Sequence, residues 1–268
     1  MISLRALFKT LGVVITLASF VLLISPILSL YQMFTKDDST RVFLNSQKYM
    51  CRLALWFLNT EMEHNIELDE FKHSNQLIIA NHVSYFDIII SASLLPVSFL
   101  GKKEITEWPL IRNLGKAAKS IFVERECMHS KVSCLYQLKK ELNNRNYLIF
   151  PEGTTTTSVH PTNEKWHDGF AFIAAQEKMN IWTLAIEYSD HEKRAWVDDM
   201  DLISHFWQTA KSPKLKAKLK IKKLQPANPE ISLRAYSKWA LSELVEDCIE
   251  AQFRLEPEAA EDLTVQSA

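Results

Sequence analysis

The stretch between Lys9 and Lys36 carries no charged side chain, and it constrains the fold more than any other feature of the chain. A helix needs about 20 apolar residues to cross a bilayer, and this stretch is longer. Pro26 lies near its far end and predicts a kink, because proline removes a helical hydrogen bond. The stretch therefore predicts a helix that spans a membrane or enters and leaves one leaflet. A fully buried helix of a soluble protein is the alternative.

Residues 41–58 form a second helical pattern of mixed character. Apolar side chains such as Leu53 and Trp56 alternate there with Arg41 and Arg52. Such a composition suits a helix that lies in the membrane interface, and it suits an ordinary domain helix equally well. Basic residues flank the uncharged stretch on both sides, so the positive-inside rule assigns no orientation.

From about residue 62 the pattern changes to short apolar runs that alternate with helical stretches. This alternation predicts an α/β domain with a mainly parallel sheet flanked by helices. We expect strands at 76–80, 120–124, 147–150 and 181–188, and helices at 86–95, 128–143 and 168–179. The chain then divides into membrane-associated helices (1–60), a catalytic domain (61–255) and an acidic tail (256–268).

The charge of the chain is nearly balanced but unevenly placed. A formal net charge of −1 gives no reason to expect a nucleic acid partner. Residues 214–222 alternate lysine with apolar residues, which predicts a strand with one solvent-exposed face. We expect either an edge strand protected by its lysines or a basic face toward anionic lipid or a phosphorylated donor. Acidic residues gather after residue 242, where 232–255 has an amphipathic helical pattern.

Polar residues follow two of the expected strands. After 76–80 come Asn81 and His82, with Asp87 five residues beyond the histidine. If the histidine sits on the turn and the aspartate in the first helical turn, the carboxylate can accept from one ring nitrogen and leave the other to take a proton. The carboxyl end of a strand is where open α/β sheets place their binding and catalytic sites. The alternative without a function is a surface histidine beside an aspartate that begins a helix.

The second polar group, after 147–150, is Glu152, Gly153 and a run of threonines that begins at Thr154. Gly153 allows a positive φ or a close backbone approach, and the loop's N–H groups and hydroxyls suit an oxyanion. A plain polar turn is the alternative. With only 5 glycines the chain has no glycine-rich phosphate loop.

Two other chemistries are disfavoured. Ser84 lacks the Gly-x-Ser-x-Gly pattern of a serine nucleophile. His160, His167 and Asp168 lie near one another in sequence, but their spacing matches no metal pattern, so we predict no metal.

Four sequence blocks together resemble the glycerophospholipid acyltransferase family, with lysophosphatidic acid acyltransferases as the nearest type. NHVSYFD (81–87) and FPEGT (150–154) resemble its first and third blocks, GKKEITEWP with IFVER the second, and IWTLAIEY the fourth. The blocks occur in the family's order over about residues 75–190. The resemblance implies the glycerolipid acyltransferase αβ fold behind an N-terminal membrane-associated helical segment.

The resemblance also implies roles for individual residues. His82 would be the general base that deprotonates an acceptor hydroxyl, and Asp87 would orient it. The hydroxyl would attack a thioester donor, acyl-CoA or acyl carrier protein, without an acyl-enzyme or a bound cofactor. Arg125 would pair with the acceptor's phosphate. The remaining substrate-binding residues would be Asn81, Lys102, Lys103, Glu152, Gly153, Thr154 and Thr155.

The expected acceptor is 1-acyl-sn-glycerol-3-phosphate, with phosphatidic acid as product, at the cytoplasmic face of a bacterial inner membrane. Family members commonly carry an arginine where this chain has Thr155, and a proline near the position of Thr183. The missing arginine keeps lyso-ornithine lipid, or another lysophospholipid, open as the acceptor. A non-catalytic lipid-binding protein of the same fold is the alternative from another class.

Overall fold

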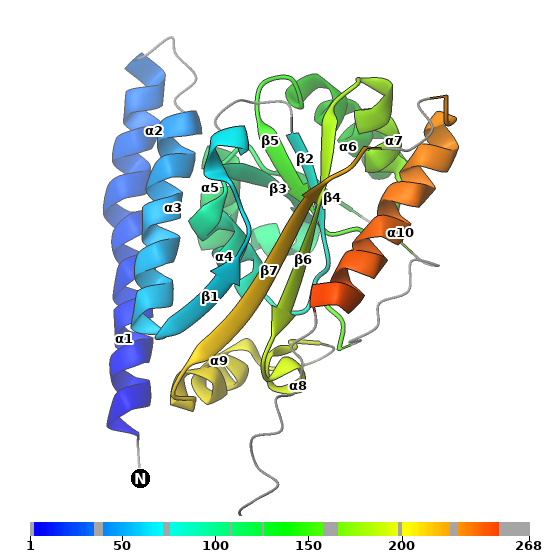
Figure 1. Cartoon of the computed structure of the whole chain (residues 1–268). Helices are drawn as coiled ribbons and strands as arrows, with labels where there is room; N and C mark the ends of the chain where they lie inside the picture. Colours follow the sequence, from blue (N-terminus) through cyan, green and yellow to red (C-terminus); the bar gives the residue numbers. More distant parts are fainter. Residues whose placement is uncertain are drawn as a thin grey trace, which may run out of the picture.

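The computed structural model describes residues 3–34, 40–71, 76–107, 109–124, 126–157, 166–197, 200–225 and 230–251. Its centre is a seven-stranded sheet in the order β1-β7-β6-β2-β5-β3-β4 (Figure 1). All neighbouring strands are parallel except β6 and β7, which confirms the expected mainly parallel α/β sheet. The strands are β1 (Thr60–His64), β2 (Gln76–Ala80), β3 (Val97–Lys102), β4 (Ile121–Val123), β5 (Asn146–Ile149), β6 (Asn180–Tyr188) and β7 (Leu215–Lys223).

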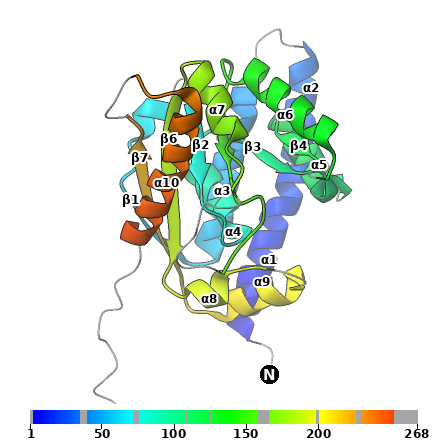
Figure 2. The same ribbon diagram turned by 90° about the vertical axis from the view of Figure 1, so that its right-hand side faces the viewer.

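Helices cover both faces of the sheet, as a parallel sheet requires. They are α1 (Leu4–Ser19), α2 (Ser25–Phe34), α3 (Thr40–Phe57), α4 (Phe86–Leu94), α5 (Pro109–Ala117), α6 (Met128–Glu141), α7 (Gly169–Gln176), α8 (His191–Arg194), α9 (Leu202–Lys211) and α10 (Leu233–Ala251). Figure 2 shows α6, α7 and α10 on one face, with α3, α4 and α1 behind the sheet. The expected strands and helices are present within the described residues, and the end of the expected helix 232–255 and the acidic tail 256–268 lie outside them. The helices α5, α8 and α9 and the strands β1 and β3 were not expected, and in the two strands charged and short polar residues interrupt the apolar pattern.

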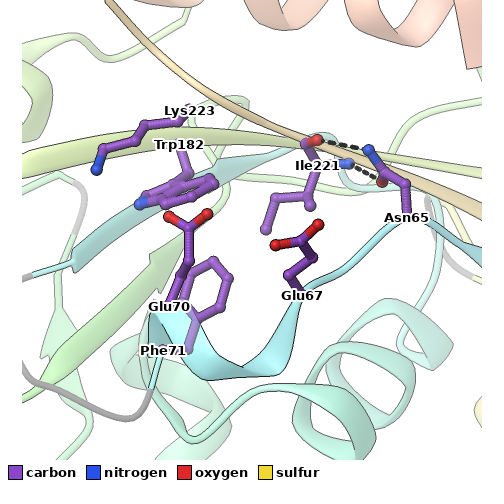
Figure 3. A pocket seen from close by; sticks show the side chains of 7 residues that line it. All are labelled: Asn65, Glu67, Glu70, Phe71, Trp182, Ile221 and Lys223. Carbon is purple, nitrogen blue, oxygen red and sulfur yellow. Dashed lines mark hydrogen bonds between the residues drawn. The ribbon is translucent and has the colours of Figure 1, made fainter.

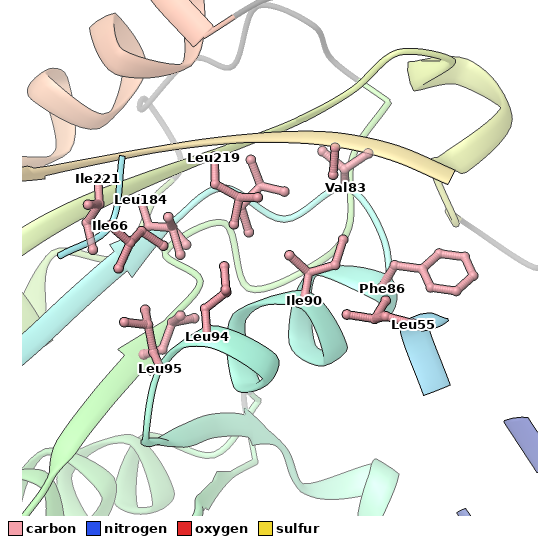
Figure 4. Packing of buried hydrophobic residues seen from close by; sticks show 14 of the residues in the cluster. Leu55, Ile66, Val83, Phe86, Ile90, Leu94, Leu95, Leu184, Leu219 and Ile221 are labelled. Carbon is pink, nitrogen blue, oxygen red and sulfur yellow. The ribbon is translucent and has the colours of Figure 1, made fainter. Parts of the chain in front are cut away.

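Side chains that alternate along the central strands divide the core in two. From β2, Ile78 and Ala80 face the helices α3 and α4, while Leu77 and Ile79 face α6, α7 and α10. Figure 4 shows the first cluster, in which Phe86 and Ile90 of α4 pack beneath the sheet beside Leu55 of α3. Every residue of β2 is buried, so the register of this strand is strongly specified.

The lysine-rich strand β7 is not the edge strand that its alternating pattern suggested. It pairs with β1 on one side and with β6 on the other, because β1 adds itself in parallel outside it. Two of its lysines pair with acids of α10: Lys220 with Asp247 and Glu250, and Lys222 with Glu243; Lys214, just before the strand, pairs with Glu61 of β1. The acidic face of α10 thus neutralises Lys220 and Lys222, two of the lysines on the basic face expected to meet lipid or a phosphorylated donor.

The N-terminal helices form one long rod. Residues Leu4–Leu28 are long and apolar enough to cross a membrane, judged by length and composition alone, and 28% of the most apolar part is buried against the protein. A π-helical segment, Phe20–Ile24, joins α1 to α2 directly before Pro26. The missing N–H and the ring of Pro26 disturb the normal helical bonding of the preceding turn, which is where the expected irregularity lies.

Gly12 and Lys9 help to hold the rod against the rest of the protein. A Cβ on Gly12 would lie 2.1 Å from the ring of Phe57, so glycine is what lets α1 approach α3 at this crossing. The ammonium group of Lys9 donates to the carbonyls of Leu58 (2.9 Å), Ser212 (2.8 Å) and Pro213 (3.1 Å). Lys9 therefore binds the domain, whereas its sequence position suggested a charge at the membrane boundary.

Candidate active site

The candidate site lies at the edge of the sheet where β2, β5 and β6 end. Parallel neighbours bring the residues that follow β2 and β5 together, and β6 continues beyond Ala80 alongside residues 81–84. Asn81 shows this directly: its amide accepts from the backbone N–H of Ile186 (2.7 Å) and donates to the Ile186 carbonyl (2.9 Å). Its amide thus links two strands, although it was expected among the substrate-binding residues.

His82 and Asp87 make the contact that their spacing predicted. The Nδ1 atom of His82 lies 2.9 Å from Oδ2 of Asp87, whose side chain is fully buried, while the histidine side chain is 15% exposed. The backbone N–H groups of Val83 (2.7 Å) and Ser84 (2.8 Å) donate to the same oxygen. An ionised aspartate only accepts, so Nδ1 carries the proton and Nε2 is the nitrogen left to take another.

The loop after β5 holds the backbone of His82 from both sides. Glu152 accepts from the His82 N–H (3.1 Å), and the Thr156 N–H donates to the His82 carbonyl (2.9 Å). The ring of Phe150 stacks on the imidazole with centroids 4.0 Å apart and planes 13° apart. Gly153 has a φ of 73°, the left-handed conformation that its lack of a side chain permits. Two motifs distant in sequence thus form one unit.

Glu152 is an unusual carboxyl group. Its Oε1 atom is buried and has no hydrogen-bond partner among the described residues. Burial raises the pKa of Glu152 to about 9, helped by the charge of Asp87 and opposed by the hydrogen bond from His82. The side chain is therefore a neutral acid at pH 7 that positions the backbone of His82.

The positive residues expected near the acceptor are less tightly organised. Lys102 ends β3 and pairs with Glu104 (3.4 Å), and Lys103 pairs with Glu124 (2.7 Å); all four side chains are largely exposed. They share the carboxyl edge of the sheet with His82, although β5 separates β3 from β2. Arg125 lies outside the described residues. Thr154 is exposed and Thr155 half-buried in the loop that holds His82.

Several residues of the site were missed in the sequence. Tyr188, the last residue of β6, donates its phenol to Oδ1 of Asp87 (2.5 Å). A second histidine–carboxylate pair, Glu187 and His191 (2.8 Å), is buried close by. Burial acts to lower the pKa of His191, but its hydrogen bond to Glu187 and the charge of Glu187 outweigh burial and raise it. Their position at the end of a strand that borders β2 was the available signal.

Two other features lie apart from His82. Within the described residues no group of three or more His, Cys, Asp or Glu is arranged to hold a metal. His160, one of the three residues considered for metal, falls outside them. A cavity of about 260 Å³ lies at the opposite end of β6, near Trp182, between Glu67, Glu70 and Lys223 (Figure 3).

Comparison with known proteins identifies the family and the fold. Residues 59–187 match the Acyltransferase family. The chain is 30% identical over 210 residues to the lyso-ornithine lipid O-acyltransferase of Rhizobium meliloti, covering 72% of this chain and 69% of that protein. It is 32% identical over 133 residues to the Pseudomonas aeruginosa lyso-ornithine lipid O-acyltransferase, where the match covers 48% of this chain and only 51% of the relative.

Two further likenesses complete the comparison. The 1-acyl-sn-glycerol-3-phosphate acyltransferase of Neisseria gonorrhoeae is 30% identical over 90 residues, or 33% of this chain and 35% of that protein. The crystal structure of the Thermotoga maritima lysophosphatidic acid acyltransferase PlsC superposes with a TM-score of 0.69, at 17% identity, over 92% of this chain and 95% of that one. The sequence match over most of a relative's length, on a shared fold, shows that this chain belongs to the acyltransferase family of lysolipid type.

Proposed function

We propose that the protein is a membrane-bound O-acyltransferase that moves a fatty acyl group from a thioester to the free hydroxyl of a lysolipid. The observation that carries this proposal is the His82–Asp87 contact, in which Nδ1 is committed to a buried carboxylate and Nε2 is left as a base. No nucleophilic side chain is needed, because the acceptor's hydroxyl is itself the nucleophile.

The reaction follows from these groups. Nε2 of His82 removes the hydroxyl proton as the oxygen attacks the thioester carbonyl, and a C–O bond forms. The tetrahedral intermediate collapses, the C–S bond breaks, and the leaving thiolate takes the proton from the imidazolium. Asp87 stabilises the imidazolium between these two steps. The face of Phe150 against the ring supports the same cation.

The acceptor that we favour is a lyso-ornithine lipid. Two observations support it: relatives named for that substrate match large parts of the chain, and Thr155 stands where family members that bind a phosphate commonly have arginine. The other candidate is 1-acyl-sn-glycerol-3-phosphate, whose acyltransferase from Neisseria is also a relative. The donor would be acyl-CoA or acyl carrier protein.

The N-terminal rod and α3 would hold the enzyme at the membrane. Their outer faces expose large apolar side chains, far more than a soluble surface normally gathers in one place. These include Val14, Ile15, Leu22, Leu23 and Ile27 of the rod and Tyr49, Leu53 and Trp56 of α3. The lysolipid would then reach His82 from the bilayer, and the thioester donor from the cytoplasm.

The test is an acyl-transfer assay on purified protein in detergent–lipid micelles. It crosses acyl-CoA and acyl carrier protein with lyso-ornithine lipid, 1-acyl-sn-glycerol-3-phosphate and lysophosphatidylethanolamine. We expect turnover with lyso-ornithine lipid, and a loss of about 10²- to 10⁴-fold in His82→Gln. His129→Gln, on the exposed face of α6, is the matched control and should keep full activity. Absence of transfer to every lysolipid, or an active His82→Gln, would contradict the proposal.

A further inference from the structure

Tyr188 occupies the far side of Asp87 from His82. Its phenol donates to Oδ1 (2.5 Å), while His82 and two backbone N–H groups share Oδ2. The three side chains therefore form a chain, Tyr188–Asp87–His82. Tyr188 reaches this place because β6 continues past the end of β2, so its last residue lies beside the turn that carries His82.

The phenol is the donor in its contact with the carboxylate, because an ionised carboxylate only accepts. Tyr188 is 1% exposed in the core formed with α4. Burial, together with the negative charge of Asp87, raises the pKa of Tyr188 well above its ordinary value of 10.0. The phenol therefore stays protonated at neutral pH, and in the structure its hydrogen is directed to the carboxylate.

We propose that Tyr188 is a positioning residue of the reaction, which sets how strongly Asp87 attracts the proton on His82. The proposal rests on the proposed function for its meaning in catalysis. Asp87 is buried and has four donors among the described residues, and the phenol is the one side chain among these besides the base itself. Tyr188 thus both fixes the rotation of the carboxylate and withdraws negative charge from the oxygen that faces His82.

This arrangement predicts a direction. Without the phenol, more of the carboxylate's charge faces the imidazole and favours the imidazolium, so the base is protonated at a higher pH. A stronger donor at the same place has the opposite effect. A residue that only fills space would change the rate by the same factor at every pH.

The experiment compares pH–rate profiles of Tyr188→Phe and the wild-type enzyme. We expect the acidic limb of kcat/KM to move to higher pH, with a loss of about tenfold near pH 6 and a much smaller loss on the plateau. Tyr147→Phe is the matched control, because Tyr147 is equally buried and its phenol donates to the Lys119 carbonyl (3.0 Å), away from Asp87. That variant should leave the limb unmoved.

A second variant guards against poor folding of the first. Difluorotyrosine at position 188 keeps the shape of the ring and is a stronger donor, so the limb should move to lower pH. The His82 ring titration, followed by NMR without substrate, should move in the same directions. If the wild-type protein transfers no acyl group, the proposed function fails while this titration still tests Tyr188. The inference would be overturned if neither the acidic limb of kcat/KM nor the titration of the His82 ring moved in either variant.

Discussion

The hydroxyl of Thr183 on β6 donates to the carboxylate of Asp247 on α10 at 2.5 Å. Asp247 is buried and also pairs with Lys220 of β7 (2.9 Å). Thr183 stands near a position where family members commonly have proline, which has no hydroxyl to donate. The threonine at this position therefore has a structural role in this chain: its hydrogen bond to the buried Asp247 helps to hold α10 against the sheet.

We therefore predict that Thr183→Val lowers the free energy of unfolding by about 1–3 kcal/mol, because it leaves one oxygen of a buried carboxylate without its donor. Denaturant unfolding measures the change. Thr106→Val is the control, since its hydroxyl bonds only to an exposed carbonyl in the Lys103–Glu107 turn, and it should change stability by less than about 0.5 kcal/mol. Equal effects of the two substitutions would contradict this account.

Glu152 makes stability depend on pH. Its pKa is 4.5 in an unfolded chain and about 9 in the folded protein, so the folded state holds the proton more tightly. Its contribution to stability is complete below pH 4.5 and is lost progressively as the pH rises to about 9. Glu152→Gln keeps the acceptor for His82 without the titration. We expect the melting temperature of the wild type to fall relative to this variant between pH 5 and pH 9.

The control for that comparison is Glu63→Gln, an exposed glutamate on β1. Its melting temperature should follow the wild type at every pH. If the melting temperatures of wild type and Glu152→Gln changed with pH in the same way across this range, titration of Glu152 would not be the origin of the pH dependence of stability.

Lys9 should matter for stability rather than for membrane binding. Its ammonium satisfies three backbone carbonyls where the rod meets the starts of β1 and β7. Lys9→Met removes this donor from the carbonyls of Leu58 and Ser212, whereas Pro213 keeps the Asn59 amide as a donor. We expect a loss of about 2–3 kcal/mol in thermal or denaturant unfolding. Arg5→Met, on an exposed part of the same helix, should cost little. Both variants should bind liposomes as the wild type does.

Phe150 stacks on the ring of His82 and restricts its rotation. Phe150→Leu keeps the bulk of the side chain but removes the aromatic face, and such contacts contribute about 0.5–1.5 kcal/mol. We expect kcat/KM to fall about two- to tenfold, with the protein still folded. Phe99→Leu on β3, packed against the same core cluster, should leave kcat/KM nearly unchanged. A Phe150→Leu enzyme of full activity would remove the stacking role.

Much of the protein was readable from local patterns. The uncharged run of the first helices, the four apolar strands β2, β4, β5 and β6 and the helices between them each carry their own period, and that period depends only on neighbours in sequence. The contact of His82 with Asp87 was also predictable, since five residues separate them and a strand–turn–helix leaves few arrangements. The role of Gly153 was predicted for the same reason, because a positive φ is a property of the turn itself and not of distant parts of the chain.

Other features depend on which strands become neighbours, and only the tertiary structure decided them. β7 appeared to be an edge strand because its lysines alternate, but β1 pairs outside it and α10 supplies acids for Lys220 and Lys222. Glu152 and Thr156 reach His82, and Tyr188 reaches Asp87, because β5 and β6 flank β2. Strand order depends on the burial of both faces summed over the whole sheet, a quantity that no short segment contains.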